Sequence, residues 1–209
     1  MNNPWLKISA PDYEGHMGLP EVNQLSFLGD VFKEFLAKYE CSSVAYLGCA
    51  TGNGLEHISN RKTRRLTAID INPEYLEVLR NRYKSRIPYL EIIEEDLNKY
   101  QGNGRQYSLI FAGLLFEYLD PLPLLRKISK WLKKTGILAV VLQLPDKYTK
   151  KVSDTPYPSL KFLDPIMKLV SDHDFKIMAK ESGLKELEGK RVTLESGKAF
   201  YIGAYGKIV

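Results

Sequence analysis

The chain has 209 residues, of which 44% are hydrophobic and 26% are charged, and its formal net charge is +5. The length suits one domain with a sizeable core, and the composition is ordinary for a soluble globular protein. No window reaches the roughly 18 consecutive apolar residues of a membrane-spanning helix, so we expect no membrane association.

Neither the first residues nor the cysteines indicate export. Residues 1–7 lack the charged-then-apolar pattern of a secretion signal, and Cys41 and Cys49 flank one predicted strand, where a bridge between them is not expected. We therefore expect a cytoplasmic protein with two reduced thiols. The densest basic run, residues 61–65, lies in the connection before the second predicted strand, and a solvated turn is favoured there over a phosphate-binding patch.

The first 40 residues divide into an arm and a helix. Residues 1–20 are rich in Pro, Gly and aromatic side chains without a clean period, which predicts an irregular arm. Tyr13 and His16 in this arm either reach an active site or only pack on the surface, and both interpretations stay open. Residues 21–39 carry apolar side chains at spacings of three and four, which predicts an amphipathic helix on one face of a sheet.

The next segment is a strand, a glycine-rich turn and a predicted helix. Residues 44–47 form a short apolar run that continues into Gly48, Gly52 and Gly54. Glycine lets backbone approach a ligand closely, and the N-terminus of the following helix offers unpaired N–H groups to an anion. A second apolar run ends in Asp70, 22 positions after Gly48, where such folds hold the ribose of a nucleotide. We therefore predict a nucleoside-containing cofactor.

Alternating helices and strands follow. Asn72 is a good N-cap and predicts a helix that ends before Pro88. Residues 89–95 predict a third strand with Asp96 at its carboxyl end, and residues 107–115 predict a fourth, followed by Glu117 near the expected substrate space.

The rest of the chain completes the sheet. A helix is predicted from Asp120 to about residue 134, a fifth strand at 137–144, a helix at 174–182, and two strands at 184–193 and 199–208. Residues 145–164 have no period, and we expect them either to shape a substrate pocket, with Tyr148 and Tyr157 as walls, or to be a plain connector. No repeat or linker divides the chain, so we predict one domain over 1–209. It comprises an arm (1–20), a leading helix (21–40) and a core (41–209).

These motifs resemble class I S-adenosylmethionine (SAM)-dependent methyltransferases of the small, single-domain kind. The resemblance rests on residues 47–54, 68–74, 94–97 and 107–119, which occur in the family's order and at its spacing. It implies an α/β, Rossmann-like doubly wound sheet of seven strands, mostly parallel, with one antiparallel strand in the C-terminal hairpin. It also implies SAM as the cofactor.

The resemblance assigns particular residues to the cofactor. Asp96 is expected at the adenine amino group, with Leu97 against the ring, and Asp70 at the ribose. The chain departs from the family at Tyr46, where an acid is usual, and at Ala50, where glycine is usual. The full set of implied cofactor-binding residues is Gly48, Cys49, Ala50, Gly52, Asn53, Asp70, Ile71, Asp96, Leu97, Gly113 and Leu114.

SAM carries an electrophilic methyl group, so the protein must position a nucleophile, exclude water and sometimes remove a proton. Candidate bases, in falling order, are His16, Glu117 and Tyr13. Three scattered His and two Cys show no metal-ligand spacing, so no metal site is expected. The leading hypothesis is methyl transfer to a small molecule. The alternatives are an RNA or protein methyltransferase, which no motif supports, and a non-catalytic SAM-fold protein that binds a ligand or partner.

Overall fold

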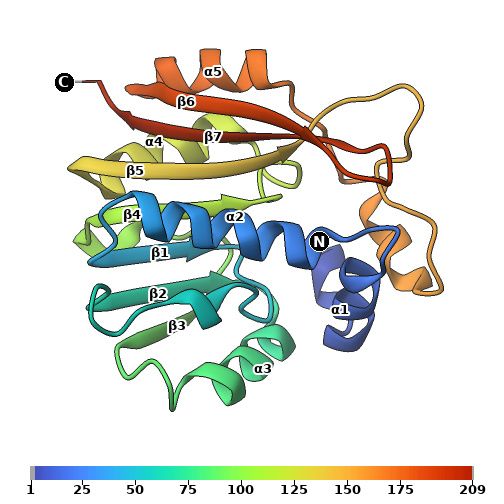
Figure 1. The fold of residues 1–209 in the computed structure, drawn as a ribbon, viewed down its shortest axis with the longest axis horizontal. Helices are drawn as coiled ribbons and strands as arrows, with labels where there is room; N and C mark the ends of the chain where they lie inside the picture. Colours follow the sequence, from blue (N-terminus) through green and yellow to red (C-terminus); the bar gives the residue numbers. More distant parts are fainter. Residues whose placement is uncertain (1–2, 209) are drawn as a thin grey trace.

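The computed structural model describes residues 3–208, and all statements below refer to these residues; positions 1, 2 and 209 of the predicted domain lie outside them. Seven strands form one sheet in the order β3-β2-β1-β4-β5-β7-β6 (Figure 1). Strands β1 to β5 run parallel, and β7 is antiparallel to both β5 and β6. The predicted doubly wound, mostly parallel sheet is therefore confirmed. The strands are β1 (Ser43–Leu47), β2 (Arg65–Asp70), β3 (Leu90–Glu94), β4 (Tyr107–Gly113), β5 (Leu132–Gln143), β6 (Leu184–Thr193) and β7 (Ala199–Lys207).

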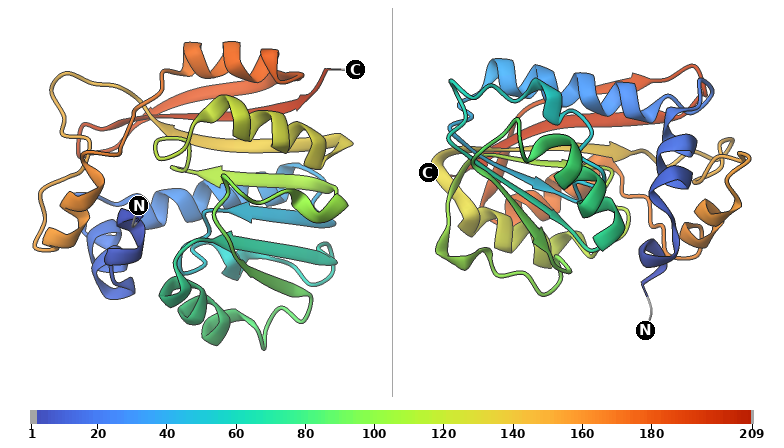
Figure 2. Two further views of the ribbon diagram at one scale, coloured as in Figure 1. Left: turned by 180° about the vertical axis from the view of Figure 1, so that it is seen from behind. Right: turned by 90° about the horizontal axis from the view of Figure 1, so that it is seen from below.

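Helices cover both faces of the sheet (Figure 2). Helices α2 (Gln24–Lys38) and α3 (Pro73–Tyr83) pack on one face, and α4 (Pro121–Trp131) and α5 (Asp172–Glu181) on the other. Side chains alternate between the two faces along each strand, so Val44 and Tyr46 join the first core while Ala45 and Leu47 join the second. The long apolar runs of the sequence thus become strands buried on both sides.

The prediction of an irregular arm was wrong. The arm contains a 3-10 helix, η1 (Pro4–Lys7), and a helix, α1 (Ala10–Gly18), both at the carboxyl end of the sheet (Figure 1). Ser9 caps α1 by accepting the N–H of Asp12, and burial of four side chains stabilises the helix. A nine-residue helix with few apolar positions gives little periodic signal, which is why the sequence pattern missed it. The four buried side chains are Ala10, Tyr13, His16 and Met17.

The prediction of a helix after the glycine turn was also wrong. Only one 3-10 turn, η2 (Leu55–His57), follows β1. Gly52 and Gly54 have φ values of 89° and 83°, and these left-handed residues stop a helix from propagating. The chain then turns back to β2, where the Arg64 N–H bonds the Ser42 carbonyl. This connection leaves α2 as the main cover over β1.

Two connections between strands contain short 3-10 helices. Residues 145–171 leave β5, include a 3-10 helix, η4 (Pro158–Leu163), and lie against the arm at the carboxyl end of the sheet (Figure 1). A short 3-10 turn, η3 (Gly102–Gly104), precedes β4. The arm, η4 and the carboxyl ends of the strands thereby surround one space.

Candidate cofactor and acceptor cavity

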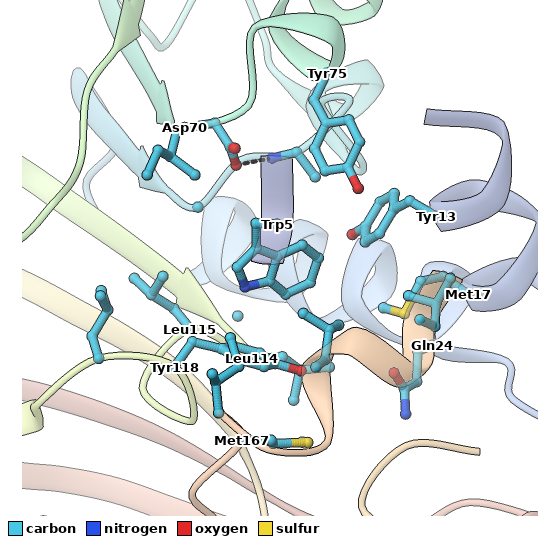
Figure 3. A pocket seen from close by; sticks show the side chains of 18 of the residues that line it. Trp5, Tyr13, Met17, Gln24, Asp70, Tyr75, Leu114, Leu115, Tyr118 and Met167 are labelled. Carbon is cyan, nitrogen blue, oxygen red and sulfur yellow. Dashed lines mark hydrogen bonds between the residues drawn. The ribbon is translucent and has the colours of Figure 1, made fainter. Parts of the chain in front are cut away.

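A cavity lies at the carboxyl ends of β1, β2 and β4, under the arm (Figure 3). One end is lined by the glycine turn, Asp70 and Asp96, and we call it the cofactor end. The other end is lined by Gln143, residues of the 145–171 segment and Lys198, and we call it the acceptor end. Open parallel sheets bind their ligands at this edge, so the position itself indicates a ligand site.

Asp70 is held by backbone at the cofactor end. Its Oδ2 accepts the N–H of Ala50 at 2.8 Å, and its Oδ1 accepts the N–H of Asn72 at 2.9 Å. Burial raises the pKa of this carboxyl, while the two backbone N–H groups act in the opposite direction. The carboxylate therefore joins the glycine turn to the start of α3 and lines the cavity beside both.

Ala50 occupies a backbone conformation that favours glycine. Its φ is 44°, and that of Gly48 is 62°. A left-handed residue other than glycine costs about 1–2 kcal/mol, so the fold, with the bond to Asp70, must hold Ala50 in place. The alanine methyl group does not prevent the turn from forming.

The structure brings most of the predicted cofactor residues together. Cys49, Gly52 and Asn53 do not line the cavity. Cys49 is buried in the core, Gly52 packs against Leu79 and Tyr83, and the Asn53 side chain donates to the Leu25 carbonyl at 2.9 Å. Those three residues shape the turn. The predicted residues that do line the cavity are Gly48, Ala50, Asp70, Ile71, Asp96, Leu97, Gly113 and Leu114.

Tyr46 is directed away from the cavity. Its ring lies in the core below α2, with ring centroids 5.1 Å from Phe32 and 5.0 Å from Phe111. The side chain is 4% exposed. The departure from the family's acid at this position therefore places an aromatic packing residue beneath the site.

Aromatic side chains fill the middle of the cavity. The ring of Trp5 lies edge-on to Tyr118 at 4.9 Å between centroids, and Tyr13 lies 5.2 Å from Tyr75 (Figure 3). Trp5 and Tyr13 come from the arm, whereas Tyr75 begins α3 and Tyr118 follows β4. The sequence analysis assigned no site role to Trp5, Tyr75 or Tyr118, because only the tertiary fold brings them together.

The arm is fastened beside the cofactor end. The Asn72 amide donates to the carbonyls of Trp5, at 2.9 Å, and Ile8, at 3.2 Å. The carboxylate of Glu14 accepts the Thr51 hydroxyl at 2.5 Å and pairs with Arg82. Thr51 belongs to the glycine turn, so the arm and the turn are linked directly.

The arm is also fastened to the segment that follows β5. His16 Nδ1 bonds the Thr155 hydroxyl at 2.8 Å, and Ser159 donates to Asp12. Tyr157 packs against Gly15 and leaves no room for a larger residue there. The arm thus bridges the two ends of the cavity.

Two of the three candidate bases reach the cavity. His16 and Tyr13 line it, each less than 10% exposed. Burial lowers the pKa of His16 to about 4, so the imidazole is neutral at pH 7, whereas burial moves the pKa of Tyr13 well above its usual value.

Glu117 is not among the residues that line the cavity. It is 1% exposed, and its Oε1 accepts the Gln143 N–H at 2.6 Å. Within residues 3–208 its Oε2 has no partner, and burial raises the pKa of this carboxyl to about 7. The expectation that Glu117 faces the substrate space is therefore not met.

Other lining residues were only partly foreseen. The expectation that residues 145–164 shape a pocket is met by Val152, Leu160 and Leu163, but Tyr148 is 95% exposed and was wrongly chosen as a wall. Tyr157 contacts the arm without lining the cavity. Of the four polar residues at the acceptor end, only His16 was singled out from the sequence, because the four come from separate parts of the chain. They are His16, Gln24, Gln143 and Lys198.

Searches for a metal cluster and for a membrane span gave negative results. No group of three or more His, Cys, Asp or Glu side chains in residues 3–208 is arranged to hold a metal ion. Within the same residues, no helix has both the length and the apolarity required to cross a bilayer.

Comparisons with known proteins agree with this geometry. Residues 44–136 match the sequence model of a family described as a methyltransferase domain, whereas no curated protein matches the chain. The methyltransferase CcbJ of Streptomyces caelestis is similar in structure, with a TM-score of 0.69 and 15% identity over 87% of this chain and 90% of its own. The N-methyltransferase NodS of Bradyrhizobium japonicum, in complex with S-adenosyl-L-homocysteine, has a TM-score of 0.65 and 15% identity, covering 88% and 87%.

A third similar structure is named for another reaction. The [4+2]-cyclase SpnF has a TM-score of 0.75 and 13% identity, covering 99% of this chain and 96% of its own. Similarity at such identities establishes architecture alone, and the family match covers residues 44–136, which are less than half of the chain. The chain therefore has the fold of class I SAM-dependent methyltransferases, and its residues 44–136 match the model of a methyltransferase domain.

Proposed function

We propose that this protein binds SAM in the cavity and transfers the methyl group of SAM to a small-molecule acceptor. The observation that carries the proposal is the convergence of Gly48, Asp70 and Asp96 at the carboxyl ends of three adjacent strands, within a cavity that continues to β5. The occurrence of bound S-adenosyl-L-homocysteine in NodS, which shares the fold, supports this assignment.

Each part of the cofactor end has a role in this proposal. Asp70 accepts hydrogen bonds from the ribose hydroxyls, Asp96 accepts one from the adenine amino group, and Leu97 lies against the ring. Gly48 lets backbone approach the cofactor, and Gly113 and Leu114 border its methionine part. SAM supplies an activated methyl group, so the chain needs no nucleophile of its own.

The arm excludes water and positions the acceptor. Trp5 and Tyr13 cover the cavity from one side, and the segment after β5 covers it from another. His16 is neutral at pH 7, and Nε2 is the ring nitrogen that Thr155 does not engage. His16 is therefore the candidate to hold or accept a proton from the acceptor, with Tyr13 as a positioning donor.

A small acceptor is favoured because the site is a cavity rather than an open groove. Its walls are mostly aromatic and aliphatic, as in sites that enclose small ligands. The exposed basic residues of 61–65 lie at the opposite end of β2 from Asp70. These charges do not border the cavity, so they give no support for an RNA acceptor there.

Calorimetric titration with S-adenosyl-L-homocysteine tests the cofactor assignment. We expect micromolar binding by the wild type and at least about tenfold weaker binding by Asp70→Asn, because the amide lacks the charge and half of the acceptor capacity of the carboxylate. Glu94→Gln is the matched control, since Glu94 is exposed at the end of β3 and does not line the cavity. Absence of wild-type binding at millimolar ligand would overturn the proposal.

Methyl transfer itself is tested with methyl-labelled SAM and a fractionated cell extract. We expect label in the small-molecule fraction. Label in RNA or protein would favour those acceptors instead, and cofactor binding without transfer to any fraction would favour the non-catalytic alternative.

A further inference from the structure

A buried lysine lies at the acceptor end of the cavity. Lys198, at the start of β7, is only 4% exposed and lines the cavity. Its ammonium group donates to the Lys151 carbonyl at 2.9 Å. An ammonium group has three donors, so two remain without a recorded acceptor among residues 3–208.

No carboxylate of the described chain pairs with this lysine. None of the ion pairs found within residues 3–208 includes Lys198. Burial lowers the pKa of Lys198 to about 8. The charge of Asp164 acts through space in the opposite direction and has the smaller effect. The group is therefore still mostly a cation at pH 7, and a buried cation without a counter-ion is costly.

Amide and imidazole groups, rather than paired carboxylates, lie with Lys198 at this end of the cavity. The Gln143 amide donates to the same Lys151 carbonyl at 3.1 Å. His16 is neutral at pH 7, and the nearby positive charge of Lys198 contributes to the lowering of its pKa. Gln24, 5% exposed, also lines the cavity. A ligand group that enters this end of the cavity thus meets a positive charge and the N–H donors of amide side chains.

The position of Lys198 assigns this charge to the acceptor rather than to SAM. From β1, the sheet passes through β4 and β5 before it reaches β7, so the start of β7 is about 14 Å from β1 at ordinary strand spacing. The acids that line the cavity, Asp70, Glu95 and Asp96, lie at the carboxyl ends of β2 and β3, and these strands are on the other side of β1. The cavity is therefore negative at the cofactor end and positive at the acceptor end.

Between these charges the walls are apolar. Met17 comes from the arm, and Val152, Leu163 and Met167 come from the segment after β5. These side chains are each less than 10% exposed. They suit an alkyl or aromatic body, and thioether side chains adapt readily to its shape.

We infer that the acceptor is an organic acid with an apolar body, whose carboxylate pairs with Lys198 while its methyl-accepting atom lies near Gly113 and Leu114. This inference rests on the proposed methyl transfer and names the substrate class for the same site. A purely structural role for Lys198, to hold the Lys151 carbonyl, would require only a hydrogen-bond donor and no charge.

The test compares 4-phenylbutanoate with 4-phenylbutanamide, which differ in charge but little in shape. Each is titrated by calorimetry into protein saturated with S-adenosyl-L-homocysteine. We expect the wild type to bind the carboxylate at least about tenfold more tightly than the amide. Lys198→Gln retains a donor for the Lys151 carbonyl but not the charge, so the preference should fall to about onefold.

Two further variants separate charge from folding. Lys198→Arg should retain the carboxylate preference, and Lys147→Met, at an exposed lysine near the same segment, should leave it unchanged. Melting temperatures identify any variant that is simply destabilised.

The outcomes distinguish this inference from the proposed function. The inference is overturned if the wild type shows no carboxylate preference, if neither probe binds, or if Lys198→Gln keeps the preference, each with S-adenosyl-L-homocysteine binding intact. Failure of S-adenosyl-L-homocysteine itself to bind would overturn the proposed function instead.

Discussion

Two buried carboxylates of this chain are stabilised to different extents by the backbone. Both oxygens of Asp70 accept backbone N–H groups, whereas only one oxygen of Glu117 does so. The other oxygen of Glu117 is buried without a partner in residues 3–208, which raises the pKa of its carboxyl to about 7. The ionised form of Glu117 therefore opposes folding.

Replacing Glu117 with Gln should stabilise the protein above neutral pH. The folded-state pKa is about 7 and the unfolded-state pKa is 4.5, so ionisation of Glu117 costs stability above pH 7, and the cost disappears as pH falls through 7 toward 4.5. Urea unfolding should show Glu117→Gln to be more stable than wild type by about 2 kcal/mol at pH 8.5, with little difference at pH 5.

The control for this comparison is Glu181→Gln, because Glu181 is exposed at the end of α5. It should follow the wild type at both pH values. A Glu117→Gln variant that is no more stable than wild type at pH 8.5 would contradict the assigned ionisation.

At the scale of elements, Asn72 joins α3 to the arm. Its side-chain oxygen caps α3 by accepting the Glu74 N–H at 2.9 Å, and its side-chain nitrogen donates to the carbonyls of Trp5 and Ile8. Asn72 thus starts α3 beside the cofactor end and tethers the arm over the same end.

The two roles can be separated with serine and alanine. Asn72→Ser keeps a cap but loses the donor to the arm, so we expect a cost of about 1 kcal/mol, whereas Asn72→Ala loses both and should cost about 2 kcal/mol. Urea unfolding measures these costs, and hydrogen exchange of residues 10–18 should accelerate equally in both variants. Protection of the arm in Asn72→Ser as strong as in wild type would disprove the tether.

Sequence patterns predicted the elements that depend on local signals. The apolar strands and the cap Asn72 were correctly recognised, because strand burial and capping leave characteristic residues, and Asp70 lies at the end of β2 as expected. The sequence patterns did not show that a helix is absent after Gly54. The left-handed φ values of Gly52 and Gly54 became evident only in the folded turn. Helix α1 depends on tertiary burial of Tyr13, His16 and Met17, which a short segment does not reveal.

At the scale of the whole molecule, the sheet separates its chemistry from its basic surface. The cavity lies at the carboxyl ends of the strands, and the exposed basic residues of 61–65 precede β2 at the opposite end, about 16 Å away at ordinary strand rise. The acceptor end could be predicted only in part, because its residues come from the arm, from the segment after β5 and from the turn before β7, and only the fold brings these together.

Neutralising the basic run should therefore leave the activity intact. A triple variant, Arg61→Gln, Lys62→Gln and Arg64→Gln, removes three exposed positive charges. We expect S-adenosyl-L-homocysteine affinity and methyl transfer to small molecules to stay within about twofold of wild type. A loss of transfer with unchanged cofactor affinity would point to an acidic macromolecular acceptor that docks at this end.

The placement of Trp5 gives the protein an internal optical reporter. The chain has two tryptophans, and the other, Trp131, lies on the opposite face of the sheet, where its indole N–H bonds the Gln101 carbonyl and its ring contacts Tyr100. Of the two tryptophans, only Trp5 lines the cavity. Emission that changes when a ligand enters therefore arises from the arm, so ligand entry can be timed in unlabelled protein by stopped-flow mixing.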